Sequence, residues 1–357
     1  MENRKVLSVV MPAYNMEAYL ARSVQSVTAA GVMDAVEIII VNDGSTDRTL
    51  EIANSIQAQY LNDIVVIDKA NGNYGSAINA ALETARGKYF KTLDCDDWYN
   101  TAHFIDYVQA LSDSDEDLII NGYSYYIERT GKVISAFSYK EPGWGQAFDL
   151  ATNVLSELRL DYQLNMPAMA FKTDVLRACG LRLLEKTFYT DTEYTYYPFQ
   201  EARTIKLLPL DFYVYYLGRE GQSMSPTNIL RHFDSKKRVI RRMIDDYLST
   251  PSKTLAHRNK RYMLRKNMPG FYQYILLSDN FRDEIDATDH LIREKAPELY
   301  EELGHYVQQV GVEYLRLFRE GVSRTTINQK INRRKAFRAS LIYRLYKRAE
   351  RLLQCRR

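Results

Sequence analysis

The stretch KTLDCDDW, residues 91–98, places three carboxylates within four residues directly after the β-prone run 88–93. Neighbouring carboxylates repel one another and favour solvent unless a cation lies among them. Their oxygens suit hard ions such as Mg²⁺ or Mn²⁺, which proteins hold through one or two carboxylates together with substrate phosphates. The stretch therefore predicts a metal and diphosphate site. An acidic turn that caps the following helix is the alternative, because such turns are common in loops.

Apolar runs upstream of this stretch alternate with helical patterns. The expected strands are β-branched and apolar, and they cover residues 6–11, 37–41, 64–68 and 88–93. Between most of them, apolar residues recur at spacings of three and four, as in amphipathic helices. This alternation predicts a doubly wound α/β sheet with right-handed crossovers.

Polar loops follow each expected strand, at residues 13–15, 42–45, 70–75 and 94–97. Ligands of such sheets bind beyond the carboxyl ends of the strands. We therefore expect the four loops to converge on one crevice.

The composition is that of an ordinary globular protein, with 46% hydrophobic and 26% charged residues. A chain of 357 residues suggests two domains. Its three cysteines are odd in number and lack metal-ligand spacing, which favours a reducing cytosol over a disulfide framework. The apolar run 6–13 is too short for a secretory signal, and no run approaches the roughly 18 apolar residues of a spanning helix. We expect a cytoplasmic protein that meets a membrane only at its surface.

Four motifs occur in a fixed order along the first hundred residues. They are VMPAYN at 10–15, IVNDGSTD at 40–47, NGNYG at 71–75 with Asn79, and GKY at 87–89 leading to DCDD at 94–97. In this order they resemble the nucleotide-sugar domain of bacterial family 2 glycosyltransferases, over residues 5–225. The resemblance implies the GT-A fold, a mixed α/β sheet, in a catalytic domain at residues 1–225. A mainly helical, basic region at residues 226–357 would follow it.

The resemblance also implies which residues bind the donor. Asp43 resembles the residue that accepts a hydrogen bond from the uracil N3–H, although an Asx turn or helix cap is its alternative role. Pro12, Ala13 and Tyr14 resemble the segment that passes along the base and ribose, although Tyr14 could equally belong to the core.

The third motif would approach the nucleotide through Asn71, Gly75 and Asn79, since glycine permits close backbone contact. A flexible surface loop is the alternative. Ile78 stands where the family often has a basic residue, so Lys69 or a later arginine would have to supply the cation.

Within the acidic run, the resemblance assigns Asp94 to the donor ribose or sugar and Asp96 to the metal. Asp97 could hold a water near the metal or orient the loop. Cys95 has no neighbouring histidine in the sequence and is not expected to be a nucleophile. Trp98 is expected to pack under the loop, with stacking on the sugar as its alternative role.

The segment FYTDTEYT, residues 188–195, resembles the family's Glu-Asp motif, whose aspartate is the catalytic base. Thr190 replaces the usual glutamate, and Asp191 is kept. Asp191 at the start of a helix would be ionised and could reach an acceptor hydroxyl. Its alternative role is a helix cap, and Glu193 is the competing base.

Residues 215–225 resemble the segment that closes over the donor in this family. Arg219 and Ser223 are the candidates for contacts with the diphosphate, where a cation would offset the negative charge of the leaving group. A solvated loop residue is the alternative for Arg219.

The C-terminal third is strongly basic. Residues 231–266 contain 12 Lys and Arg. Residues 321–357 contain 12 more and one acidic residue, Glu350, so the net charge of this segment is 12 − 1 = +11. Apolar residues at helical spacing near the end favour a helix that lies on an anionic membrane surface. They are Phe337, Leu341, Leu345 and Leu352. A solvated helix packed on its own domain is the alternative, and nucleic acid is not expected because no reading motif is present.

Together these patterns and the resemblance predict a glycosyltransferase that depends on Mn²⁺ or Mg²⁺, and the resemblance implies that it inverts the anomeric carbon. It would move a sugar from a nucleotide-diphosphate donor, most simply a UDP-sugar, to a hydroxyl of a glycan or lipid-linked acceptor, as in cell-surface polysaccharide synthesis. It would work at the inner face of the cell membrane. One alternative is a catalytically inactive sugar-nucleotide or glycan-binding module that tethers an assembly complex at the membrane. A sugar nucleotidyltransferase is less favoured, since no Gly-rich loop with Lys or Arg follows the first strand.

Overall fold

A computed structural model describes residues 5–137, 139, 142–158, 160–161, 163–218, 228, 231–275, 281–305, 310–323, 325–327, 329–330 and 332–333. The chain divides into two compact units, with the boundary after Lys266. The first unit holds the sheet and the second is helical.

The sheet of the first unit has the strand order β3-β2-β1-β4-β9-β6-β10-β5. Its strands are β1 (Leu7–Ala13), β2 (Val36–Asp43), β3 (Ile64–Lys69), β4 (Tyr89–Thr92), β5 (Trp98–Tyr99), β6 (Leu118–Ile127), β7 (Lys132–Ser135), β8 (Ala147–Asp149), β9 (Met169–Lys172) and β10 (Thr204–Leu217). Strands β1 to β4 run parallel. All eight residues of β2 are buried, as expected for a parallel strand covered on both faces.

The other half of the sheet mixes directions. Strand β9 runs antiparallel to both of its neighbours, β4 and β6. Strand β10 is parallel to β6 and antiparallel to the short β5, which directly follows the acidic run. Strands β7 and β8 are added at β6 and β10. The predicted mixed α/β sheet is therefore confirmed.

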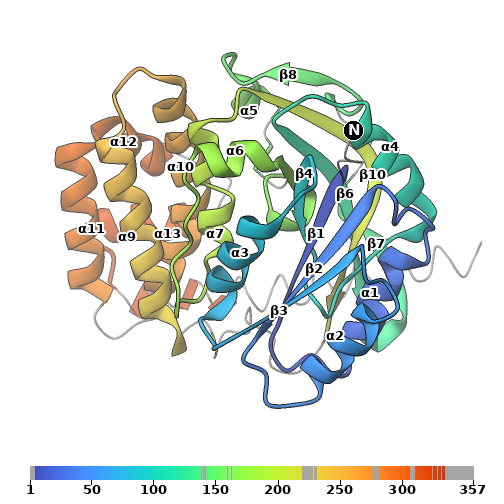
Figure 1. Ribbon diagram of the computed structural model, residues 1–357. Helices are drawn as coiled ribbons and strands as arrows, with labels where there is room; N and C mark the ends of the chain where they lie inside the picture. The colour runs from blue at the N-terminus through green and yellow to red at the C-terminus, as the bar shows by residue number, and fades with distance from the viewer. Residues whose placement is uncertain are drawn as a thin grey trace, which may run out of the picture. The chain divides into compact units, whose positions relative to one another are not determined.

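Helices cover the sheet and connect its parallel strands (Figure 1). The helices of the first unit are α1 (Leu20–Thr28), α2 (Thr49–Gln57), α3 (Asn73–Thr84), α4 (Phe104–Ser112), α5 (Val154–Glu157), α6 (Thr173–Ala178), α7 (Asp191–Tyr194) and α9 (Phe233–Ser249), with most of α10 (Leu255–Ile275). The apolar side of α1 buries Leu20, Val24 and Val27, the stripe that the sequence predicts.

Helix α9 is part of the first unit because its side chains and backbone bind the sheet domain. The hydroxyl of Tyr196 donates to the carbonyl of Met243 at 2.9 Å, and Arg242 pairs with Glu193 at 2.7 Å. The first compact unit thus continues to residue 266, beyond the end of the catalytic domain predicted at residue 225. The compact unit does not test where the catalytic residues end, so the domain boundary at residue 225 stays a prediction.

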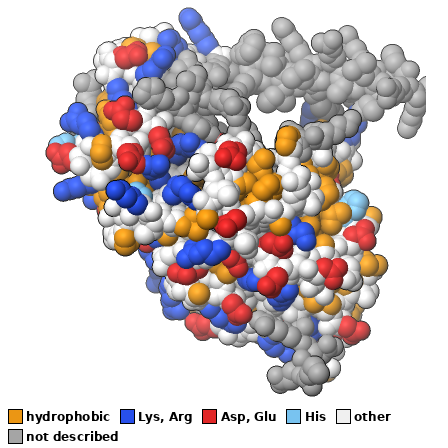
Figure 2. Space-filling model, turned by 90° about the horizontal axis from the view of Figure 1, so that it is seen from above, with side chains coloured by type: hydrophobic (Ala, Val, Ile, Leu, Met, Phe, Trp, Pro, Cys, Tyr) orange, Lys and Arg blue, Asp and Glu red, His pale blue; other side chains and the backbone are white. Residues whose placement is uncertain are grey.

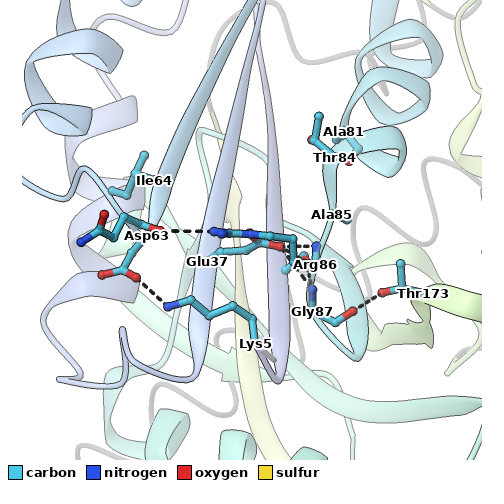
Figure 3. Close-up of polar contacts among 12 residues, drawn as sticks. Lys5, Glu37, Asp63, Ile64, Ala81, Thr84, Ala85, Arg86, Gly87 and Thr173 are labelled. Atoms are coloured by element: carbon cyan, nitrogen blue, oxygen red, sulfur yellow. Dashed lines mark hydrogen bonds and ion pairs between the residues drawn. The ribbon is translucent and has the colours of Figure 1, made fainter. Parts of the chain in front are cut away.

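A buried carboxylate joins the amino ends of the parallel strands (Figure 3). Glu37 on β2 is fully buried and accepts hydrogen bonds from the Ser8 hydroxyl at 2.6 Å and the backbone N–H of Arg86 at 2.5 Å. The Arg86 guanidinium pairs with the other oxygen of Glu37 at 2.8 Å. This network lies at the sheet edge opposite the polar loops, so its role is structural.

The second unit contains the end of α10 with α11 (Phe281–Lys295), α12 (Pro297–His305) and α13 (Val310–Arg319). Its polar centre is Asp289, which accepts from the Tyr272 hydroxyl at 2.7 Å and pairs with Arg319 at 2.6 Å. Within the described part of the chain, none of the helices combines the length and the apolar character that crossing a membrane requires.

The basic tail carries the predicted membrane contact, and its residues from 334 onward lie outside the described residues.

On the face shown in Figure 2, Asp and Glu side chains lie among Lys and Arg side chains. That face therefore presents charges of both signs.

Candidate active site

Four loops meet at the carboxyl edge of the parallel strands, as the sequence predicts. The loop after β1 is tied to the loop after β2, because the backbone N–H of Asn15 donates to Ser45 Oγ at 3.0 Å and Asn15 Oδ1 accepts from the N–H of Thr46 at 2.8 Å. The acidic run joins the same edge, since the thiol of Cys95 donates to the carbonyl of Pro12 at 3.2 Å.

Asp43 is the last residue of β2 and is only 3% exposed. Its Oδ1 pairs with Lys69 Nζ at 2.9 Å and accepts from the backbone N–H of Gly72 at 2.9 Å. The backbone carbonyl of Asp43 accepts from the Asn71 amide at 2.8 Å. Asp43 thus joins the loops after β2 and β3, and Lys69, the proposed substitute cation, contacts this carboxylate.

The first loop presents Tyr14 to solvent, since this side chain is 48% exposed and does not belong to the core. Pro12 is half-buried and Ala13 is buried at the end of β1. These residues lie at the loop edge where a base and ribose are predicted to pass.

Gly75 and Asn79 on α3 contact the segment that leads to α7. A Cβ on Gly75 would lie 2.4 Å from the carbonyl oxygen of Leu184, so only glycine permits this approach. Asn79 is 5% exposed; its amide donates to the carbonyl of Leu183 at 2.9 Å and accepts from the Leu183 N–H at 2.8 Å. Both residues therefore position this segment, and their predicted contact with the donor stays a prediction.

The acidic run gathers Asp94, Asp96 and Asp97. One ligand atom from each lies within 4.8 Å of the others. Three carboxylate oxygens at this spacing are the donor set that Mg²⁺ or Mn²⁺ prefers, so the residues fit a divalent ion.

Asp97 differs from the other two because it is only 2% exposed. It accepts hydrogen bonds from the Tyr213 hydroxyl and from the backbone N–H of Tyr216 at 2.7 Å. Burial, followed by the charges of Asp94 and Asp96, holds the pKa of Asp97 well above its usual range. Asp97 therefore fastens the acidic loop to β10, which matches the orienting role left open by the sequence.

Tyrosine and arginine side chains from distant segments hold the loop. The Tyr74 hydroxyl donates to Asp94 Oδ1 at 3.1 Å, and burial together with the charge of Asp94 raises the pKa of Tyr74. Arg22 on α1 donates to the carbonyl of Asp96 at 2.6 Å while its guanidinium lies 4.4 Å from the centre of the Trp98 ring. Motif comparison did not single out Tyr74 or Arg22 for these roles.

Cys95 is buried between these carboxylates. Burial, followed by the neighbouring charges, raises the pKa of its thiol well above the usual value, so a reactive thiolate is disfavoured.

Asp191 and Glu193 lie in different surroundings although both are in α7. Glu193 is 0% exposed; one oxygen pairs with Arg242 at 2.7 Å and the other accepts from the Leu184 N–H at 2.9 Å. Asp191 is exposed. Burial is the main cause that raises the pKa of Tyr74 and of Tyr215. The negative charge of Asp94 raises both pKa values further, and the negative charge of Asp191 adds to this. Asp191 and the acidic run thus act on the same two tyrosines.

Arg219 and Ser223, the predicted diphosphate contacts, lie outside the described residues. The described part of β10 ends at Leu217, shortly before them.

Comparison with known proteins finds similarities to a family model, to individual proteins and to solved structures. Residues 8–155 match the model of glycosyl transferase family 2. The chain is 26% identical over 227 residues to the uncharacterized glycosyltransferase MG025 homolog of Mycoplasma pneumoniae, covering 62% of this chain and 71% of that protein. It is 37% identical over 98 residues to the minor teichoic acid biosynthesis protein GgaB of Bacillus subtilis, covering 27% and 11%.

Among solved structures, the chain is similar to residues 1–349 of Staphylococcus aureus TarS in complex with UDP-GlcNAc. The TM-score is 0.61 with 18% sequence identity, over 88% of this chain and 92% of the TarS chain.

Proposed function

We propose that the chain is a family 2 glycosyltransferase with the predicted GT-A fold, and that it transfers a sugar from a UDP-sugar to an acceptor hydroxyl with inversion at the anomeric carbon. The observation that carries this proposal is that α3 joins the acidic run to the segment of Asp191. The Tyr74 hydroxyl donates to Asp94 at 3.1 Å, and a Cβ on the adjacent Gly75 would lie 3.2 Å from Oγ1 of Thr190, the residue before Asp191. A carboxylate pair that would serve the leaving group would thus lie near a separate carboxylate that would serve the acceptor.

The donor would bind across the four loops. Lys69 and Gly72 use Oδ1 of Asp43, so its Oδ2 would accept the uracil N3–H. Pro12, Ala13 and Tyr14 would line the base and ribose, and Asn71 would hold the neighbouring loop. The UDP-GlcNAc bound to TarS supports a uridine nucleotide. Arg219 and Ser223 remain the proposed contacts of the diphosphate.

Asp96, with Asp94, would hold Mn²⁺ or Mg²⁺. When bound, such an ion supplies positive charge that neutralises the leaving diphosphate. The Tyr74 hydroxyl binds the Asp94 carboxylate, and Arg22 binds the backbone carbonyl of Asp96. Asp97 binds the backbone of β10. These contacts would orient the ligands before the donor binds.

Asp191 would act as the general base. It would accept the proton of the acceptor hydroxyl while the oxygen attacks the anomeric carbon from the face opposite the diphosphate, and the bond to the diphosphate breaks. Glu193 is a poor candidate, because both of its oxygens are occupied by Arg242 and the Leu184 N–H.

We place the reaction in the synthesis of a cell-surface polysaccharide, with a glycan or lipid-linked acceptor at the inner face of the cell membrane. The similarity to a teichoic acid biosynthesis protein supports this setting. The basic tail would provide the membrane contact.

The test is release of UDP from UDP-GlcNAc, UDP-GalNAc and UDP-glucose with Mn²⁺, with Mg²⁺ or with a chelator, in the presence of extracted cell-envelope glycans. The proposal predicts turnover of at least one donor, lost with the chelator and in Asp96→Ala. Full turnover in the chelator or in Asp96→Ala would contradict it. Donor binding without turnover would instead support the inactive binding module.

A further inference from the structure

Basic residues of α9 and α10 bind the sheet domain through specific contacts. Arg242 pairs with Glu193, and Arg258 donates to the carbonyl of Thr152 at 3.0 Å. Lys260 donates to Gln200 Oε1 at 3.1 Å and pairs with Asp246 of α9 at 2.7 Å. Two lysines of these helices, Lys236 and Lys266, differ from Arg242 and Lys260. Among the described residues, no carboxylate lies within ion-pair distance of either.

Lys236 on α9 lies beside the proposed base. Its ammonium donates to Thr192 Oγ1 at 3.0 Å, next to Asp191 in α7, and lies 5.5 Å from the centre of the Tyr189 ring. Tyr189 has a φ of 64°, an unusual backbone conformation for an aromatic residue. Lys236 thus contacts residues on both sides of Asp191.

Lys266 on α10 contacts residues 164–165, which lie shortly before β9. Its ammonium donates to the carbonyl of Leu164 at 2.8 Å and to Asn165 Oδ1 at 3.1 Å. The sulfur of the next residue, Met166, lies 3.2 Å from the Tyr74 hydroxyl oxygen, and this hydroxyl donates to Asp94. Lys266 therefore supports the segment that contacts the acidic run.

Both ammonium groups are half-buried and have only neutral acceptors in contact. Burial lowers the pKa of Lys236, and the negative charge of Asp191 opposes this shift. Burial lowers the pKa of Lys266 to about 8, and the negative charges of Asp161 and then Asp191 oppose that shift. Removing an ammonium from water without a counter-charge is unfavourable, so an anion bound here would be stabilised. Asp161 and Asp191 act on these lysines from beyond ion-pair distance, and the carboxylate of Asp191 is needed as the base.

We propose that Lys236 and Lys266 form an anion-binding subsite beside Asp191, which takes a phosphate or carboxylate of the acceptor. The inference rests on the proposed function, since it names the acceptor class of that site. A chain with alternating hydroxyl and anionic groups would place a hydroxyl at Asp191 when its neighbouring anion contacts the lysines. Two sources share this chemistry: a phosphodiester-linked polyol and a glycan of uronic acids.

The experiment measures binding of three oligomers of similar length to the full chain in the presence of UDP and Mn²⁺, by isothermal titration calorimetry. The probes are a glycerol phosphate oligomer, an oligogalacturonate and a neutral maltooligosaccharide. The variants are Lys236→Gln, Lys266→Gln and the double variant. Lys206→Gln is the matched control, because Lys206 is also half-buried and donates to a hydroxyl, that of Ser114, at 2.9 Å.

We expect at least one anionic probe to bind more tightly than the neutral one, and the tighter anionic probe identifies the source. Each glutamine variant should weaken its binding about tenfold, and Lys206→Gln should not change it. Lys236→Arg, which keeps the charge, should retain most of the affinity. Affinity for UDP should stay the same in all variants.

Equal binding of neutral and anionic probes, or unchanged binding in the double variant, would overturn the proposal. If the variants do not fold, the wild-type protein still decides, because only the affinity for the anionic probe should fall with rising NaCl concentration. Anion binding without turnover of any UDP-sugar would reject the proposed function and keep the subsite. Turnover without preference for an anionic acceptor would reject the subsite alone.

Discussion

Within the acidic run, Asp97 lies in different surroundings from Asp94 and Asp96. The backbone N–H of Tyr216 and the hydroxyl of Tyr213 bind its two oxygens, and the side chain is buried. Asp94 and Asp96 are half-buried beside the crevice. The same chemical group therefore fastens a strand in one position and belongs to the proposed metal site in the others.

Lys266 makes the stability of the protein depend on pH in the alkaline range. Its folded-state pKa of about 8 lies below the ordinary 10.5, so the unfolded chain binds more protons between these values. The stability of the wild type should therefore rise with pH through this window, relative to Lys266→Met, by at most about 3 kcal/mol. Urea unfolding of both proteins at pH 7.5 and pH 10 measures this difference. The free energy of unfolding of the wild type minus that of Lys266→Met should rise between pH 7.5 and pH 10. If this value stays constant or falls, the lowered pKa of Lys266 is wrong.

At the scale of elements, α3 and the segment before α7 are in direct backbone contact at Gly75. In Gly75→Ala the new methyl group would lie 2.4 Å from the Leu184 carbonyl, so the segment that leads to Asp191 must move. We expect kcat to fall by about tenfold or more while the affinity for UDP changes little. Steady-state kinetics and UDP titration measure the two effects.

Gly270→Ala is the matched control for this substitution. Gly270 lies in α10, and a Cβ there meets no other atom within 4 Å, so activity should be unchanged. Loss of activity in both variants, or in neither, would contradict the positioning role of Gly75.

The network around Glu37 fixes the amino ends of β1, β2 and β4 (Figure 3). Glu37→Gln removes the buried negative charge that faces Arg86 and should lower the free energy of unfolding by about 2–3 kcal/mol. Glu51→Gln is the control, since Glu51 pairs with Arg48 on the surface and should leave the urea midpoint unchanged. A midpoint in Glu37→Gln equal to that of the wild type would contradict the structural role.

Local patterns account for what the sequence predicts well at this scale. Continuous apolar runs identify β1 to β4, and polar residues after each run identify the four loops, because both signals lie within about ten residues. Contacts between distant segments carry no such signal. The bond from Arg22 to Asp96 spans 74 residues, and the docking of Arg242 on Glu193 spans 49. The bonds between Asn79 and Leu183 span 104 residues and likewise have no local signal, while the donor contact of Asn79 stays a prediction.

At the scale of the whole molecule, the sequence predicts an excess of positive charge at the C-terminus that contacts a membrane. We expect the full chain to co-sediment with vesicles that contain anionic phospholipid and not with neutral vesicles. Replacing Arg344, Lys347 and Arg351 by glutamine should weaken binding by about 1 kcal/mol for each residue. Equal binding to neutral vesicles, or no effect of the triple replacement, would contradict a charge-driven contact.

The most direct test of the account compares Asp191→Asn with Glu193→Asp. The measurement is the rate of sugar transfer at saturating UDP-sugar and Mn²⁺, with UDP affinity determined in parallel. If Asp191 is the base, Asp191→Asn should lower kcat by about a hundredfold or more with unchanged UDP affinity, whereas Glu193→Asp should mainly lower stability. Near wild-type kcat in Asp191→Asn would contradict the assignment of Asp191 as the catalytic base.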